Sequence, residues 1–197
     1  MTKYSVMVVG MGKRGKHHAQ AFHDNDNFEV TGICDIATDK LPEFAATIGN
    51  PSIGSDAAAM AAELKPDVFC FCTHPNLRYD FIKIGVDCGA KLIAFEKPIA
   101  LTSSEAFKIK KLLDGKDVKV VVSHQHRYGQ HYRKVKEIID SGALGRVHTV
   151  YATTPGWMLH MCTHMIDYMR WYAGDPAAEW VMGQAAGKIK FKVGRIL

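Results

Sequence analysis

The chain has 197 residues, of which 47% are hydrophobic, and a formal net charge of +5. This length and apolar content suffice for a globular core in one large domain, or one domain and part of a second, and they exclude a disordered chain. Lysines and arginines are scattered rather than clustered, so nucleic acid is not expected as a partner.

The chain contains no apolar run of about 18 residues, and its N-terminus enters a predicted strand almost at once. We therefore expect neither a membrane span nor a signal peptide, and predict a cytoplasmic protein without a membrane partner. The five cysteines form no C-x-x-C pair, and their odd number argues against a disulfide framework. Reduced thiols are the expectation.

The first predicted element is the β-branched, apolar run Tyr4–Val9, which breaks into a G-x-G-x-x-G loop and continues into a helix. In such a unit the first glycine makes the sharp turn, the second admits a pyrophosphate, and the third lets the helix pack closely on the strand. The loop predicts dinucleotide binding by six consecutive residues: Gly10, Met11, Gly12, Lys13, Arg14 and Gly15.

A second apolar run, Phe28–Cys34, ends in Asp35, twenty residues after Gly15. A carboxylate at this distance is placed to accept a hydrogen bond from the adenosine ribose 2′-hydroxyl. It also repels a 2′-phosphate, and the nearest following cation is Lys40. The sequence therefore favours NAD over NADP.

The following segments alternate between strand and helix patterns. Helices are expected at 39–48, 57–64, 79–88, 103–113 and 130–140, and strands at 52–54, 68–72, 91–95 and 118–122. Near-continuous apolar strands that alternate with helices are typical of a parallel sheet covered on both faces. We predict an α/β fold, a doubly wound Rossmann sheet, over residues 1–123.

The loops after the predicted strands should meet at one edge of this sheet, because parallel strands all end on the same side. The loops concerned are 10–15, 35–37, 73–76, 96–98 and 123–127. A second α/β domain is expected to begin at residue 124, with a strand at 146–153, a helix at 159–172 and a half-buried strand at 188–193. One such strand cannot make a sheet, so 124–197 is expected to be incomplete.

Several motifs together resemble the glucose-fructose oxidoreductase, inositol dehydrogenase and rhizopine-catabolism (Gfo/Idh/MocA) family. These are the glycine loop, the acidic residue closing the second strand, Thr73-His74-Pro75-Asn76, Glu96-Lys97-Pro98, the run from Ser141 to Arg146, and His164-Met165-Ile166-Asp167. The resemblance covers roughly residues 4 to 185.

This resemblance implies an NAD(P)-dependent oxidoreductase that acts on a sugar, cyclitol or related polyol, with Rossmann and C-terminal α/β domains. It assigns Lys97 to the nicotinamide and substrate hydroxyl, and His164 to acid/base chemistry. The two family loops add Thr73, His74, Asn76 and Glu96 to the cofactor site. The alternative for Glu96 and Lys97 is that they are simply two solvated residues of a loop.

The chemistry fits these roles. Oxidising a secondary alcohol needs a proton acceptor while hydride leaves, and histidine titrates near neutrality. A lysine orients the hydroxyl or stabilises developing alkoxide charge. The chain has His160 where the family often has aspartate, and Arg78 where it often has histidine. His160 shares a helix face with His164. It is therefore expected to act as the acid/base group, to assist it, or to contact the substrate.

Two alternatives stay open at the level of sequence. The pair His160 and His164, with His124 and His126, forms a possible zinc site, although it lacks the H-E-x-x-H glutamate and no metal is expected. The segment from His124 to Tyr128 is otherwise assigned to the substrate cleft. Nonfunctional surface positions are expected for the remaining histidines: His17, His18, His23, His131 and His148.

Family members typically continue for well over a hundred further residues, which form the sheet that floors the active site and builds a homo-oligomer. We therefore expect a C-terminally truncated chain, with an uncovered apolar patch that favours association. The main hypothesis is an NAD-dependent dehydrogenase, and the alternative is a truncated, non-catalytic dinucleotide-binding module.

Overall fold

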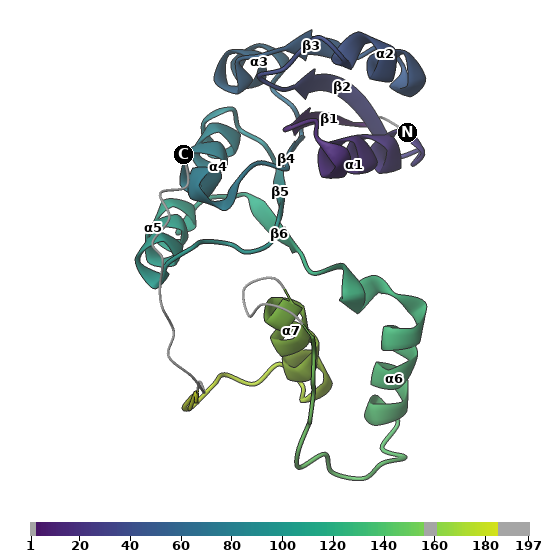
Figure 1. Cartoon of the computed structure of the whole chain (residues 1–197), viewed down its shortest axis with the longest axis vertical. Helices are drawn as coiled ribbons and strands as arrows, with labels where there is room; N and C mark the ends of the chain where they lie inside the picture. The colour runs from purple at the N-terminus through teal and green to yellow at the C-terminus, as the bar shows by residue number, and fades with distance from the viewer. Residues whose placement is uncertain (1–2, 156–160, 185–197) are drawn as a thin grey trace.

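The computed structural model describes residues 3–155 and 161–184, and its first two thirds form a layered α/β unit (Figure 1). The strands are β1 (Tyr4–Val9), β2 (Phe28–Cys34), β3 (Ser52–Gly54), β4 (Val68–Phe71), β5 (Leu92–Glu96) and β6 (Lys119–Ser123). The helices that connect them are α1 (Lys13–His23), α2 (Leu41–Ala45), α3 (Ala57–Leu64), α4 (Arg78–Asp87) and α5 (Ser103–Leu113).

Within the described residues, six parallel strands form one sheet in the order β3-β2-β1-β4-β5-β6. The chain builds outward from β1 to β3 and then returns to the other side of β1, so the direction of winding reverses between β1 and β4. This is the doubly wound Rossmann order. The fold class predicted from the sequence is confirmed.

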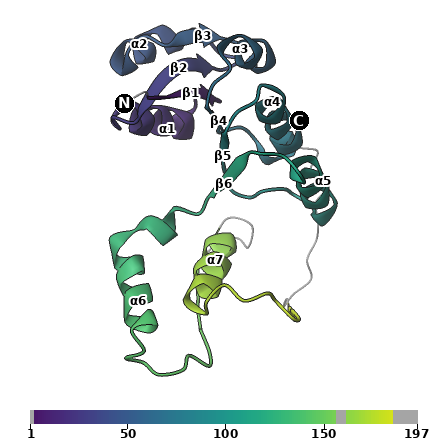
Figure 2. The same cartoon turned by 180° about the vertical axis from the view of Figure 1, so that it is seen from behind.

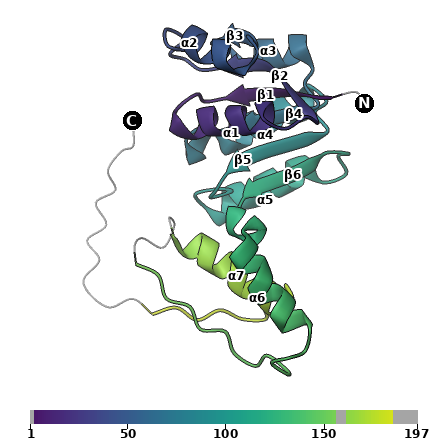
Figure 3. The ribbon, with the colours of Figure 1, turned by 90° about the vertical axis from the view of Figure 1, so that its right-hand side faces the viewer.

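Alternate residues of the strands feed two hydrophobic cores, one on each face of the sheet. Met7, Phe69 and Phe71 pack on the side covered by α3, α4 and α5. Val6, Val8 and Ile33 pack on the other side, with α1, α2 and the short turn Ala46–Ile48. Because successive strand residues point to opposite faces, only strands that are apolar throughout can supply both cores. Figure 3 shows the helices flanking the stacked strands.

Several predicted boundaries move by one to three residues. The largest shift is at the predicted helix 39–48, which begins at Leu41 as α2 and tightens into a 3-10 turn from Ala46. Gly49 then ends the turn with a φ of +88°, a left-handed conformation that glycine adopts without steric cost.

Beyond β6, the described residues include two α-helices, α6 (Gln130–Asp140) and α7 (Thr163–Tyr172), after a 3-10 turn at Gln125–Tyr128. Opposite views place both helices beyond the β6 edge of the sheet (Figures 1 and 2). The part of helix 159–172 at residues 159–160, and the predicted strand 188–193, lie outside the described residues.

The strand predicted at 146–153 is wrong. These residues have no regular secondary structure, and Tyr151 is 92% exposed. An extended segment becomes a strand only when a neighbour satisfies its backbone groups, and no described strand lies beside this one. Among the described helices, none combines the length and apolarity needed to cross a membrane.

Candidate dinucleotide site

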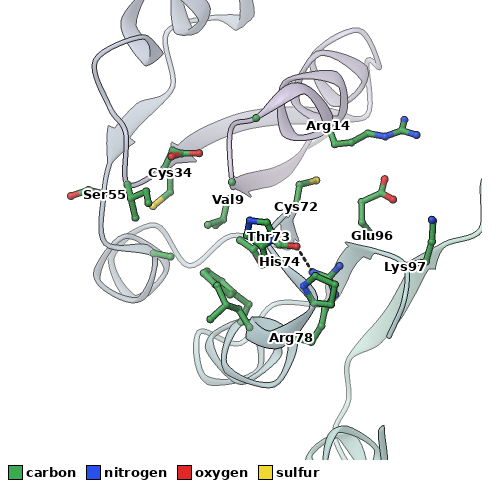
Figure 4. Close-up of a pocket in the computed structure, with 18 residues that line it drawn as sticks. Val9, Arg14, Cys34, Ser55, Cys72, Thr73, His74, Arg78, Glu96 and Lys97 are labelled. Carbon is green, nitrogen blue, oxygen red and sulfur yellow. Dashed lines mark hydrogen bonds between the residues drawn. The ribbon is translucent and has the colours of Figure 1, made fainter. Parts of the chain in front are cut away.

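A cavity of about 610 Å³ opens at the carboxyl ends of the strands, at the point where the winding reverses (Figure 4). It is lined by Gly10 after β1, Asp35 after β2, Thr73 and His74 after β4, and Lys97 after β5. Four of the five loops expected to converge therefore do so. The fifth, 123–127, follows β6 at the same edge but does not line this cavity.

The glycine loop has the geometry that the motif predicts. Gly10 has a φ of +82°, and a Cβ there would lie 2.9 Å from the carbonyl oxygen of Cys72. A Cβ on Gly15 would lie 1.9 Å from the carbonyl oxygen of Gly10, so only glycine permits this helix–loop contact. A Cβ on Gly12 would meet nothing within 4 Å, which leaves space for a ligand to approach.

The carboxylate of Asp35 accepts hydrogen bonds from the glycine loop and from its own loop. Its Oδ2 accepts a hydrogen bond from the backbone N–H of Met11 at 2.6 Å, and its Oδ1 accepts one from Ala37 at 2.9 Å. The carboxylate is thereby fixed beside the glycine loop and at the rim of the cavity. This is where the sequence places the ribose contact.

The residues fit a dinucleotide. The N-terminus of α1 begins at Gly12 without a side-chain cap, so its N–H groups and the helix dipole face the loop ready for an anion. The hydroxyl oxygen of Thr73 is buried and has no hydrogen-bond partner in the structure, although this residue lines the cavity. An unpaired polar group at such a wall is a suitable ligand contact.

A second cluster joins the segment after β6 to α7. The His164 ring is 6% exposed and stacks on His126 at a centroid distance of 4.6 Å, with His124 edge-on at 5.3 Å. Burial, followed by the charges of His126 and Lys97, lowers the pKa of His164 to about 4. His164 is therefore neutral near pH 7, the form that accepts a proton, and it lies within the electrostatic reach of Lys97.

Arg127 holds this second cluster together. Its Nε donates to Oδ2 of Asp167 at 2.8 Å, and its Nη1 and Nη2 donate to the carboxylate of Asp175, each at 2.9 Å. The guanidinium also lies 5.7 Å from the ring centroid of Trp171. These contacts raise the pKa of Arg127 and lower that of Asp175, and they fix the turn after β6 against α7.

The profile of the family GFO_IDH_MocA, described as an oxidoreductase family with an NAD-binding Rossmann fold, matches residues 4–124. The chain belongs to this family. Its membership accounts for the glycine loop, the topology and the cavity at the winding reversal, and it confirms the resemblance drawn from the motifs.

Curated relatives of the chain include sugar and inositol dehydrogenases. The D-glucoside 3-dehydrogenase of Escherichia coli (strain K12) is 24% identical, with 93% of this chain and 58% of the relative covered. The inositol 2-dehydrogenase of Rhizobium meliloti (strain 1021) is 28% identical, with 75% of this chain and 44% of the relative covered. The chain spans about half the length of the curated relatives it matches.

Solved structures share the fold. The scyllo-inositol dehydrogenase of Lactobacillus casei, with bound NAD(H) and scyllo-inositol, superimposes with a TM-score of 0.78 at 19% identity. The match covers 88% of this chain and 57% of that one. The myo-inositol dehydrogenase of the same organism, in complex with NAD(H) and myo-inositol, gives a TM-score of 0.76 at 22% identity, with 88% and 55% covered.

Most of the family's cofactor positions predicted from the sequence line the cavity, and four, Met11, Lys13, Gly15 and Asn76, do not. Those that line it are Gly10, Gly12, Arg14, Asp35, Thr73, His74, Glu96 and Lys97. The Met11 side chain is buried beneath the loop, so its backbone N–H is the group at the site. Lys13 and Asn76 are exposed and lie outside the lining.

His18 is half-buried, unlike the other histidines expected at the surface. Its Nε2 lies 3.0 Å from Oε1 of Glu96, which joins α1 to the loop after β5. The hydrogen bond to Glu96 raises the pKa of His18 and lowers that of Glu96, so each partner favours the charged form of the other. No local pattern marks His18, because its partner lies 78 residues away. The other histidines assigned to the surface are exposed: His17, His23, His131 and His148.

Two further predictions have different outcomes. His160, assigned to catalysis, lies outside the described residues. Within residues 3–155 and 161–184, no group of three or more histidine, cysteine or acidic side chains is arranged to hold a metal ion, and the stacking of His126 on His164 uses the ring faces. The zinc alternative therefore gains no support from this part of the chain. The five cysteines are free thiols.

Proposed function

We propose that the chain is the cofactor-binding part of an NAD-dependent dehydrogenase that oxidises a secondary hydroxyl of a sugar, cyclitol or related polyol. The observation that carries the proposal is that one cavity contains the glycine loop, Asp35 and Lys97. Residues 1–123 are the NAD-binding domain and 124–197 the beginning of the substrate domain. The names of the relatives, glucoside and inositol dehydrogenases, support this substrate class.

The order of the strands orients the cofactor in this proposal. Asp35 follows β2 and Lys97 follows β5, with β1 and β4 between them. Three strand spacings of about 4.8 Å separate these ends by roughly 14 Å. With the adenosine ribose at Asp35 and the pyrophosphate at the N-terminus of α1, the nicotinamide lies at the Lys97 end.

The proposed catalytic groups then have distinct tasks. Bound NAD accepts the hydride from the substrate carbon. Lys97 orients the substrate hydroxyl and stabilises negative charge on its oxygen, and His164 accepts the proton in its neutral form. His160 remains a candidate for the same proton transfer. Specificity for one polyol depends on side chains of the substrate domain.

Calorimetric titration with NADH and with NADPH tests the cofactor assignment. We expect NADH to bind at least tenfold more tightly, about 1.4 kcal/mol, because the Asp35 carboxylate repels a 2′-phosphate. In Asp35→Asn the preference shrinks, whereas Asp39→Asn, an exposed acid that lines no cavity, leaves it unchanged. Failure of the folded protein to bind either nucleotide would refute the proposal.

Turnover tests the enzyme assignment. With myo-inositol, scyllo-inositol and methyl glucosides as probes, we expect NADH formation that Lys97→Ala lowers by at least about a hundredfold, as for loss of a catalytic acid/base group. NADH binding without turnover on any probe would instead favour the non-catalytic dinucleotide-binding module.

A further inference from the structure

Arg78 is the charged residue most deeply buried in the wall of the cavity. It is the first residue of α4, directly after the short turn Pro75–Leu77, and it is 2% exposed. Its guanidinium carbon lies 5.5 Å from the ring centroids of both Phe71 and Phe95. The cation therefore lies beside the aromatic rings of two neighbouring strands, β4 and β5, which stack on each other at a centroid distance of 5.0 Å.

The guanidinium joins the two loops at this end of the cavity. Its Nη1 donates to the carbonyl oxygen of Thr73 at 2.9 Å, in the loop after β4. Its Nε donates to the carbonyl oxygen of Pro98 at 3.2 Å, in the loop after β5 and directly beyond Lys97. Figure 4 shows the contact with Thr73 beside the cavity, with Lys97 across from it.

We infer that Arg78 is a positioning residue that fixes the nicotinamide end of the dinucleotide site by joining these two loops. The inference rests on the proposed function, which places the nicotinamide between Thr73 and Lys97. Removing the guanidinium frees both loops at once, whereas neither of its two hydrogen bonds goes to the glycine loop or to Asp35, which hold the other half of the cofactor.

The geometry requires a guanidinium. Its planar fork reaches two carbonyl oxygens on separate loops and keeps its face on the aromatic rings. A lysine ammonium is a flexible point donor that does not reproduce both contacts with fixed geometry. A methionine fills similar volume but leaves the carbonyls of Thr73 and Pro98 without their donor.

Two ligands separate this role from a general effect on folding. ADP-ribose contains the adenosine, the pyrophosphate and the second ribose but lacks nicotinamide, whereas NADH contains all four. In Arg78→Met and Arg78→Lys we expect the Kd for NADH to rise at least tenfold while the Kd for ADP-ribose changes less than twofold. Arg133→Met is the matched control, since this arginine is exposed on α6, and it should change neither Kd.

Amide hydrogen exchange measures the mobility of the two loops without any nucleotide. Amides of residues 73, 74, 76, 77 and 99–101 should exchange at least tenfold faster in Arg78→Met, while those of β1 and α1 remain protected. Equal weakening of both ligands, or unchanged NADH affinity with unchanged exchange, would overturn the inference. A wild-type chain that binds neither ligand would instead refute the cofactor proposal, and the exchange result alone would then decide whether Arg78 joins the loops.

Discussion

The properties of individual residues in this chain depend on their burial more than on their type. The chain has ten histidines, and those on the surface, such as His148, contrast with His164, which is buried and packs against the rings of His124 and His126. Burial disfavours the charged imidazolium, so the pKa falls, whereas the carboxylate beside His18 raises its pKa. The same residue type thus supplies a neutral base at one position and the hydrogen-bond partner of a carboxylate at another.

We predict that His164 destabilises the fold in acid. Its pKa is about 4 in the folded chain and 6.5 in the unfolded one, so the unfolded chain binds the extra proton between these values. The free energy of unfolding therefore falls as pH drops through this window, by about 1 to 3 kcal/mol from this group. In His164→Gln, urea unfolding at several pH values should show a flatter curve. His148→Gln, at an exposed position, should parallel the wild type, and parallel curves for both variants would contradict the prediction.

At the scale of an element, the start of α1 shows how three glycines in one motif have different jobs. Contacts within the protein require glycine at positions 10 and 15, because a Cβ atom at either position would collide with a backbone carbonyl oxygen. Gly12 has ordinary backbone angles, φ −65° and ψ −171°, and open space around it. Folding therefore constrains the first and third glycines, and ligand binding constrains the second.

Substitution of these glycines should separate stability from binding. Gly12→Ala should change the unfolding free energy by less than about 1 kcal/mol, because its angles suit alanine. It should weaken NADH binding at least tenfold, because the methyl group occupies the approach to the pyrophosphate. Gly15→Ala should cost about 3 kcal/mol or more through the clash with Gly10. Thermal unfolding and calorimetry measure both effects, and normal NADH affinity in folded Gly12→Ala would contradict the assignment.

The interactions that stabilise the molecule differ between the residues before Ser123 and those after β6. Both hydrophobic cores are made from residues before Ser123, and among the described residues none beyond Val122 belongs to them. The part after β6 is held instead by the ring cluster around His164 and by the ion pairs of Arg127, which are partly solvated. Partly exposed ion pairs contribute less than buried apolar surface.

We therefore predict that residues 1–123 fold without the remainder. This fragment should unfold cooperatively and bind NADH within about threefold of the whole chain, roughly 0.7 kcal/mol. Circular dichroism and calorimetry on the fragment check this, with Gly12→Ala in the fragment as the control for specific binding. A fragment that is unfolded, or folded without NADH affinity, would show that the proposed domain boundary is wrong.

Sequence patterns alone predicted the doubly wound sheet, the glycine loop and the positions of Asp35 and Lys97 at the strand ends. These features follow from local periodicity and from the rule that parallel strands end on one side, so they are readable within short windows. The strand predicted at 146–153 was wrong because pairing depends on a neighbour that a local pattern does not contain.

Contacts between side chains that are far apart in the sequence became known only from the tertiary structure. His18 pairs with Glu96 across 78 positions, Arg78 reaches Pro98 across 20, and Arg127 reaches Asp167 across 40. The sequence marked Arg78 merely as a departure from the family's usual histidine, and its burial beside two stacked aromatic rings gave that departure a physical role. Hydrogen bonds and burial depend on chain segments brought together by folding, and no local spacing encodes them.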